Sequence, residues 1–142
     1  MSFSSERTAI VTWFSSQWNT NDGKVFYENQ KLTVPDDIYL VLTILPGDAR
    51  PASIASQGIS KRLFRYSGIV QVDLYAKKES GTIAIKTKAD LVHDIFLNKR
   101  LNPSADEKIQ FQVPYLTSVG DTEERHRMMV TCPFYRDSYL LK

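Results

Sequence analysis

One cysteine and two histidines are the side chains in this 142-residue sequence best suited to catalysis or metal binding. Cys132 would act as a nucleophile only as a thiolate beside a base. It alternates with Met128, Val130 and Phe134, a pattern that indicates a small buried hydrophobic residue on a strand. Because it is the only cysteine, an internal disulfide and a multi-cysteine zinc site are both excluded.

The two histidines could serve as general bases or metal ligands. His93 adjoins Asp94 on a predicted helix, where an exposed histidine is more common than a base with a tuned pKa. His126 follows Glu123 and Glu124, and an enzyme that uses His126 with one of these carboxylates is one hypothesis. The spacing supplies no further metal ligands, so a solvated strand edge is the favoured interpretation.

Sequence motifs of other catalytic or nucleotide-binding sites are absent. Neither the phosphate-binding pattern GxxxxGKS/T nor GxGxxG occurs. The adjacent acidic pairs Asp36-Asp37 and Glu123-Glu124 would point to opposite faces of an extended chain, so they do not predict a pair of catalytic carboxylates. We therefore predict that the protein is not an enzyme and uses no cofactor or metal ion.

Residues 48–65 carry an excess of positive charge, and residues 47–62 show no helix or strand periodicity. We predict a protein–protein interface here, because arginine beside aromatic residues is typical of such surfaces. The predicted interface residues are Arg50, Lys61, Arg62, Phe64 and Arg65. We expect exchange of Arg62 and Arg65 for glutamate to disturb assembly and leave the monomer folded. Two alternatives stay open: a solvated hairpin, and a nucleic-acid-binding module that uses the four basic residues and loses affinity steeply with salt.

The composition is that of a globular protein, with 42% hydrophobic and 24% charged residues, and the length suits one domain spanning residues 1–142. No apolar run approaches the ~18 residues of a membrane span, and the polar start predicts no signal peptide. The formal net charge of +2 is too balanced to predict nucleic-acid binding from charge alone.

Two helices are predicted to position the loop and the strands. The first covers about Ser4–Trp18, capped by Ser4 or Ser5 and with Glu6 at its positive end. The second opens at Ser80-Gly81-Thr82 and reaches about Leu97. The expected apolar faces are Ile10, Trp13, Phe14 and Gln17 in the first helix, and Ala84, Leu91, Val92, Ile95 and Phe96 in the second.

The strands are expected at residues 25–28, 38–45, 63–77, 109–115 and 128–135. Pro46-Gly47 is expected to stop the second strand and Asn102-Pro103 to separate the second helix from the last strands, although the edges of residues 47–62 could extend their neighbours into a long hairpin. The order helix, strands, helix, strands predicts an α+β fold, with a mixed, largely antiparallel β-sheet and two α-helices packed on one face.

Four segments, in this order and spacing, carry a likeness to a known family. They are Val25–Asn29, Ile38–Asp48 with its Leu-Pro-Gly ending, Gly68–Ala76 followed by Gly81-Thr82, and Pro133–Arg136. The sequence resembles the siphophage tail-terminator and minor tail protein family, to which the lambda tail terminator belongs. It departs from the family at Lys77–Ser80, where relatives often have a proline and small residues.

The resemblance implies a structural protein of the virion tail, present in the host cytoplasm during assembly. It implies a homo-oligomeric ring, expected to be a hexamer, that caps the head-proximal end of the tail tube, stops tube polymerisation and provides the head-joining surface. The implied partners are other copies of the chain, the tail tube protein and a head-completion protein, with genome DNA passing through the lumen without sequence-specific binding and no membrane involved. A head–tail connector or another minor tail protein is the alternative.

Overall fold

The structure is a computed structural model that describes residues 2–28, 33, 35, 37–51, 61–78, 81–104, 107–121 and 125–141. It contains the helices α1 (Phe3–Gln17) and α2 (Ile83–Phe96) and a short 3-10 helix, η1 (Thr20–Asp22). The strands are β1 (Lys24–Tyr27), β2 (Tyr39–Pro51), β3 (Lys61–Lys77), β4 (Arg100–Ser104), β5 (Glu107–Phe111), β6 (Tyr115–Asp121) and β7 (Arg125–Leu141).

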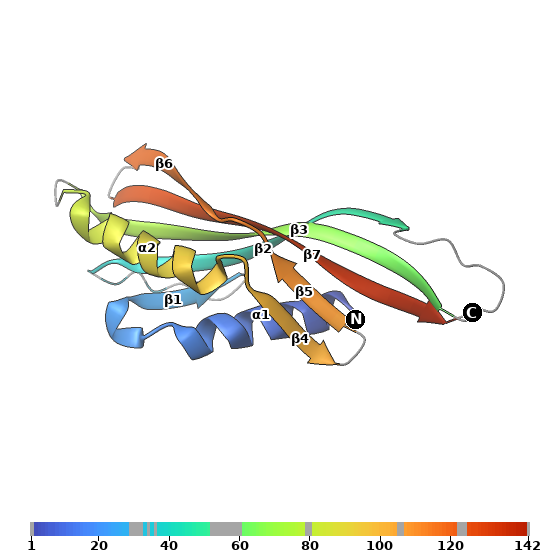
Figure 1. The fold of residues 1–142 in the computed structure, drawn as a ribbon. Coiled ribbons are helices and arrows are strands. Elements are labelled where there is room, and N and C mark those ends of the chain that lie inside the picture. Colours follow the sequence, from blue (N-terminus) through green and yellow to red (C-terminus); the bar gives the residue numbers. More distant parts are fainter. Residues whose placement is uncertain are drawn as a thin grey trace.

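The seven strands form one curled sheet in the order β1-β2-β3-β7-β5-β4, with β6 also paired to β7 (Figure 1). Among the described strands, only the pair β1–β2 is parallel, and the other pairs are antiparallel. The long strand β7 pairs with β3 along its whole length, while its other edge pairs first with β6 and then with β5. The predicted α+β fold with a mixed, largely antiparallel sheet is confirmed.

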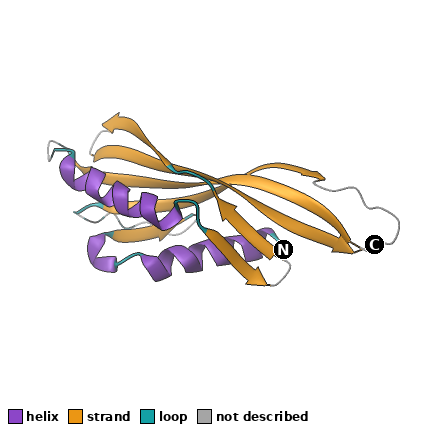
Figure 2. Cartoon of the chain, viewed as in Figure 1, coloured by secondary structure: helices purple, strands orange, loops and turns teal. Residues whose placement is uncertain are grey.

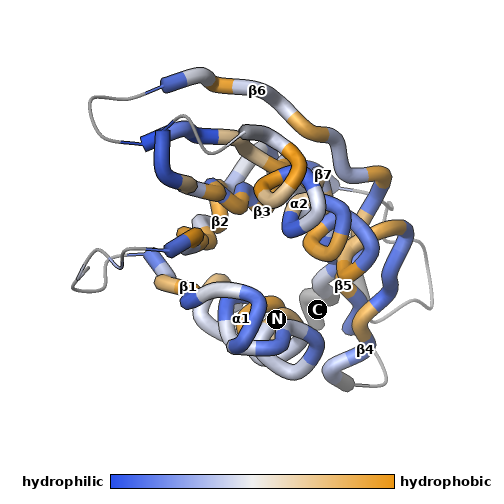
Figure 3. Tube along the Cα trace, turned by 90° about the vertical axis from the view of Figure 1, so that its left-hand side faces the viewer, coloured by the Kyte–Doolittle hydropathy of each residue, from blue (hydrophilic) through white to orange (hydrophobic). Residues whose placement is uncertain are grey.

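Both helices cover the same face of the sheet, as predicted (Figure 2). In the end-on view, α1 closes the curled sheet between β1 and the β4–β5 pair (Figure 3). Alternate residues of β3 and β7 point to the helices, which confirms the period-2 pattern of the sequence. The buried residues of these two strands are Val70, Val72, Leu74 and Ala76 in β3, and Met128, Val130, Cys132 and Phe134 in β7.

The first helix has its N-cap two to three residues earlier than predicted. Ser2, rather than Ser4 or Ser5, is the N-cap, and its hydroxyl accepts a hydrogen bond from the Ser5 backbone N–H at 3.1 Å. This satisfies one of the amides that a helix leaves unpaired at its start. On the core side Ile10 and Phe14 are fully buried as predicted, whereas Gln17 is exposed.

The second helix buries only part of the predicted stripe. Val92 and Phe96 are buried and Ile95 packs partly buried against the core, as predicted. Ala84 and Leu91 are exposed, and Ile85 and Ala89 take core positions in their place. The sequence offers apolar residues over more than one face of this helix, so periodicity alone did not select the face that packs on β3 and β7.

Two predicted strand breaks lie inside strands. Pro46-Gly47 falls within β2, where the register shifts between Pro46 and Ala49, so the strand is bent there by a bulge and continues. Asn102-Pro103 falls within β4, the last strand in the sheet order, and an edge strand tolerates proline because one row of its N–H groups has no ladder partner. The predicted strand 109–115 is divided at Gln112–Pro114, and Val113 is 64% exposed.

Candidate assembly interface

The ends of three long strands project beyond the helices (Figure 1). We call this part the arm and define it as residues 46–51 of β2, 61–67 of β3 and 135–141 of β7, which pair in that order. All five predicted interface residues lie on it. The expectation that the edges of residues 47–62 extend a long hairpin is confirmed for 47–51 and 61–62, and residues 52–60 lie outside the described residues.

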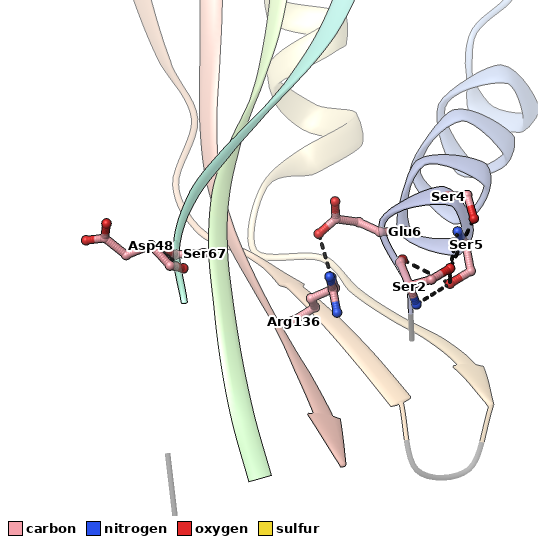
Figure 4. Close-up of polar contacts among 7 residues, drawn as sticks. All are labelled: Ser2, Ser4, Ser5, Glu6, Asp48, Ser67 and Arg136. Atoms are coloured by element: carbon pink, nitrogen blue, oxygen red, sulfur yellow. Dashed lines mark hydrogen bonds and ion pairs between the residues drawn. The ribbon is translucent and has the colours of Figure 1, made fainter. Parts of the chain in front are cut away.

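A buried ion pair fastens the base of the arm to the first turn of α1 (Figure 4). The Arg136 Nε donates to the Glu6 Oε1 at 2.8 Å, and the two side chains are 1% and 7% exposed. The Arg136 guanidinium lies over the rings of Phe3 and Tyr66, at 5.0 and 4.2 Å from their centroids. Burial raises the pKa of Glu6, although the hydrogen bond and charge of Arg136 oppose it.

This pair was missed from the sequence, where Glu6 was interpreted only as a charge at the positive end of the helix. A signal was present, because Glu6, Ile10 and Phe14 follow one another at a spacing of four and therefore share one face of α1. An acidic residue on an apolar helix face requires a partner, since burying an unpaired carboxylate is costly. The sequence does not indicate which of the 18 basic residues provides it.

The opposite face of the arm carries a second ion cluster, centred on Asp137. The Arg65 Nε and Nη2 donate to the two Asp137 carboxylate oxygens at 2.8 and 3.2 Å, and the Lys108 Nζ lies 3.6 Å from Oδ2. The Arg65 guanidinium also covers the Tyr135 ring at 4.1 Å. Burial by itself would raise the pKa of Asp137, but the hydrogen bonds and charges of Arg65 and Lys108 outweigh it and hold this pKa below its ordinary value.

Replacing Asp137 with asparagine is expected to lower the free energy of unfolding by about 1–3 kcal/mol at neutral pH. The pKa of Asp137 in the folded protein lies below its unfolded pKa of 3.8. The pairing therefore stabilises the fold fully at pH values above the unfolded pKa, and this stabilisation is lost as the pH falls through the folded pKa. The difference in the free energy of unfolding between wild type and Asp137→Asn should therefore shrink in strong acid. Urea unfolding at about pH 7 and about pH 2.5 measures this difference, and the same difference at both pH values would contradict a stabilising role of the ion cluster.

The predicted interface residues differ in whether their side chains are already engaged by other residues of the same chain. Arg50 is exposed and lies opposite Arg65 in the β2–β3 register, whereas Arg65 is engaged by Asp137. Exchange of Arg65 for glutamate would place two carboxylates together, so it would disturb the fold as well as any interface. Arg50→Glu is the cleaner test.

Three of the predicted residues remain to be placed. Phe64 is half-buried and pairs with Pro51 on one side and Ser138 on the other. The backbones of Lys61 and Arg62 pair with the end of β7, but their side chains lie outside what the structure describes. A cavity of about 390 Å³ lies at the base of the arm, where Arg50 and Arg65 line it together with Asp48, Gln112 and Tyr135. The arm thus presents a basic, partly concave surface.

The three candidates for chemistry are not brought together. Cys132 is buried in the core, and burial raises the pKa of its thiol to about 12, so it is protonated near neutral pH. His93 contacts Asp94 at 3.1 Å on the exposed side of α2. The His126 Nδ1 lies 2.7 Å from the Asp121 Oδ1, which was not a predicted partner. The proposed partners of His126, Glu123 and Glu124, lie outside the described residues.

The described ranges include no group of three or more His, Cys, Asp or Glu side chains arranged to hold a metal ion. Of the helices in the described part of the chain, none has the length and hydrophobicity of a transmembrane segment. The candidate functional site among the described residues is therefore the arm, with its two ion clusters and its basic surface.

Comparison with known proteins identifies the family. The family model described as "Phage tail terminator protein" matches residues 7–134. One solved structure, of a protein that carries no descriptive name, is similar over 96% of this chain and 98% of that chain, with a TM-score of 0.65 and 16% sequence identity, and it supports the fold alone. Among curated proteins, no match to the chain was found. Because the family model spans nearly all of the chain, this protein belongs to the phage tail terminator family and is a structural component of the phage tail.

Proposed function

We propose that the chain, as a single domain of residues 1–142, assembles into a hexameric ring on the head-proximal end of the tail tube. The ring stops polymerisation of the tube protein and offers a surface to a head-completion protein. Family membership makes the protein a tail component, and the observation that supports the finer role is the arm. It projects from a body whose core is already complete, so its surface is available for contacts between molecules.

The arm also has open strand edges. Strand β1 pairs only with residues 39–42 of β2, so in the described part of the chain the outer edge of β2 beyond Leu42 has no strand partner. Exposed strand edges are templates for pairing with another chain unless they are protected. In a ring, each copy contacts its neighbour through two different surfaces, and the arm supplies one of them.

The proposal also covers catalysis, the passage of DNA and the place of assembly. The ring performs no catalysis, because the thiol of Cys132 is buried and protonated near neutral pH and the two histidines contact exposed aspartates. Genome DNA passes through the lumen without sequence-specific binding, which suits a chain with a net charge of only +2. Assembly takes place in the host cytoplasm, and the finished ring is part of the virion tail.

The test is the length of tubes formed by the tail tube protein with and without this protein. We expect tubes capped at one end by a ring and arrested in length when the protein is added, as seen by negative-stain imaging. Arg50→Glu should require about tenfold more protein for the same arrest, because a charge at the rim of an interface governs association. Lys86→Glu, an equivalent change on the exposed side of α2, is the control. Tubes whose length ignores the wild-type protein would refute the proposal.

A further inference from the structure

The cavity at the base of the arm contains an arginine whose charge is not balanced within the subunit. Arg50 and Arg65 lie directly opposite each other in the β2–β3 register, so their side chains share one face of the arm. Arg65 is paired with Asp137, whereas Arg50 is exposed and has no ion pair among the described residues. Like charges directly opposite each other in a sheet repel. A carboxylate from another molecule beside Arg50 would relieve this repulsion.

The other residues that line this cavity also suit a carboxylate. Gln112 and Tyr135 bear hydrogen-bond donors, and Asp48 is the only acidic residue among the described lining residues, against two arginines. The Arg65 guanidinium is fixed by Asp137 and by the Tyr135 ring, so this part of the cavity is in place before a partner arrives. The cavity is therefore a pre-organised basic surface that fits an acidic partner.

An acidic surface lies on α2, toward the end of the molecule opposite the arm (Figure 1). Asp90 and Asp94 are exposed and stand four residues apart, so they share the helix face that points away from the buried Ile85 and Ala89. Asp94 contacts His93, and Asp90 has no ion pair among the described residues. Because like charges at this spacing destabilise a helix, this pair also carries charge that its own subunit leaves unbalanced.

The basic and acidic surfaces lie on opposite sides of one subunit. Arg136 turns toward α1, so its neighbour Asp137, with Arg65 and Arg50, lies on the side of the sheet without helices. The two aspartates lie on the outer side of α2, on the side with helices (Figure 2). An arm that overlaps the next subunit can therefore rest on its α2 while both subunits keep the same side up. Such a contact joins two different surfaces head to tail, as a closed ring requires.

We propose that Arg50 on the arm of one copy binds Asp90 and Asp94 on α2 of the next copy. The proposal rests on ring assembly as the function, and it names the second surface that each subunit offers to its neighbour. The partner is a second copy because this chain itself carries the complementary charge, unbalanced and exposed, at its opposite end. Since all three side chains are exposed in the free subunit, salt should weaken the contact.

Mixing two charge-reversed variants of the full chain tests the contact. Arg50→Glu alone and Asp90→Lys/Asp94→Lys alone should each weaken self-association at least about tenfold at low ionic strength, because each brings like charges together. An equimolar mixture of the two should recover association to within about threefold of wild type, since every contact between the two variants joins opposite charges. Sedimentation velocity measures the association, and the differences should shrink in about 1 M salt.

Two controls separate this contact from a general effect of net charge. Asp37→Lys/Asp121→Lys makes the same change of charge at two exposed aspartates outside α2. It should leave association within about threefold of wild type and should not rescue Arg50→Glu in a mixture. Lys86→Glu makes α2 more acidic, so it should not weaken association. Circular dichroism and thermal unfolding establish that each variant folds.

The outcomes distinguish this contact from ring capping itself. Normal association of Asp90→Lys/Asp94→Lys, or a mixture that associates no better than its components, would overturn the contact and leave ring capping intact. Rescue of Arg50→Glu by Asp37→Lys/Asp121→Lys would also overturn it. If Arg50→Glu impaired the arrest of tubes but not self-association, Arg50 would meet the tube protein instead of a neighbour. A wild-type protein that neither associates nor limits tube length under any assembly condition would overturn both proposals.

Discussion

Replacing Arg136 with methionine is expected to lower the free energy of unfolding by about 3–5 kcal/mol at neutral pH, the usual cost of removing one partner of a buried ion pair. Methionine approximates the length of the side chain but leaves Glu6 as a buried carboxylate with no partner in the pair. It also removes the cation that lies over the rings of Phe3 and Tyr66. Urea unfolding of the wild type and the variant measures the loss.

Two further variants isolate the ion pair. Arg7→Met removes a neighbouring α1 arginine whose contact with Glu28 is 3.6 Å long and partly exposed, so it should cost no more than about 1 kcal/mol. The double variant Glu6→Leu/Arg136→Met replaces both charges with apolar side chains and should recover most of the loss. An Arg136→Met variant no less stable than Arg7→Met would contradict the structural role of the pair.

The Arg136→Met defect should also depend on pH. Burial already raises the pKa of Glu6, and loss of the opposing arginine raises it further. A carboxyl whose folded pKa lies above its unfolded value contributes most at low pH, and that contribution disappears as pH rises through the folded pKa. The variant should therefore approach wild-type stability in acid and differ most at neutral pH. If the variant is less stable than wild type by the same free energy of unfolding at acid and neutral pH, the lost stability comes from packing alone.

Val72→Asp is expected to unfold the protein. Val72 is 1% exposed at the centre of β3, where it faces both the helices and Val130 of β7. An unpaired carboxylate at such a position costs more than about 4 kcal/mol, which is comparable to the whole stability of a domain of this size.

The matched control for Val72→Asp is Val113→Asp. Val113 is 64% exposed between β5 and β6, so the same substitution there should change stability by no more than about 0.5 kcal/mol. Far-ultraviolet circular dichroism and a thermal melt distinguish the two variants. A cooperative, wild-type-like melt for Val72→Asp would show that β3 is not packed as the structure places it.

Ion pairs within the molecule hold the arm in place, which bears on the proposed contact between copies. The pair of Glu6 with Arg136 ties β7 to α1 of the same molecule, and the pair of Asp137 with Arg65 links β7 to β3 within the arm. A pre-organised arm pays less conformational entropy when it meets a neighbour. Residues that appear from their charge to belong to an interface can therefore act inside the subunit, as Arg65 does.

The sequence by itself determined the features that depend on neighbours along the chain. Alternation in 70–76 and 128–134 predicted which side of β3 and β7 is buried, because successive residues of a strand point to opposite faces. The order of the elements predicted the α+β fold, and the resemblance of four short segments to a known family indicated the family that the family model then identified. The location of the basic interface residues on the arm is established, while their role as an interface stays a prediction.

Only the tertiary structure decided the features that depend on distant partners. Glu6 and Arg136 are 130 residues apart, so no local pattern could pair them, and the same holds for Arg65 and Asp137. Pro46-Gly47 and Asn102-Pro103 resemble strand breaks locally but lie within strands, because a bulge accommodates the first and an open sheet edge the second. The face of α2 that is buried was likewise chosen by β3 and β7, since packing decides among helix faces of similar hydrophobicity.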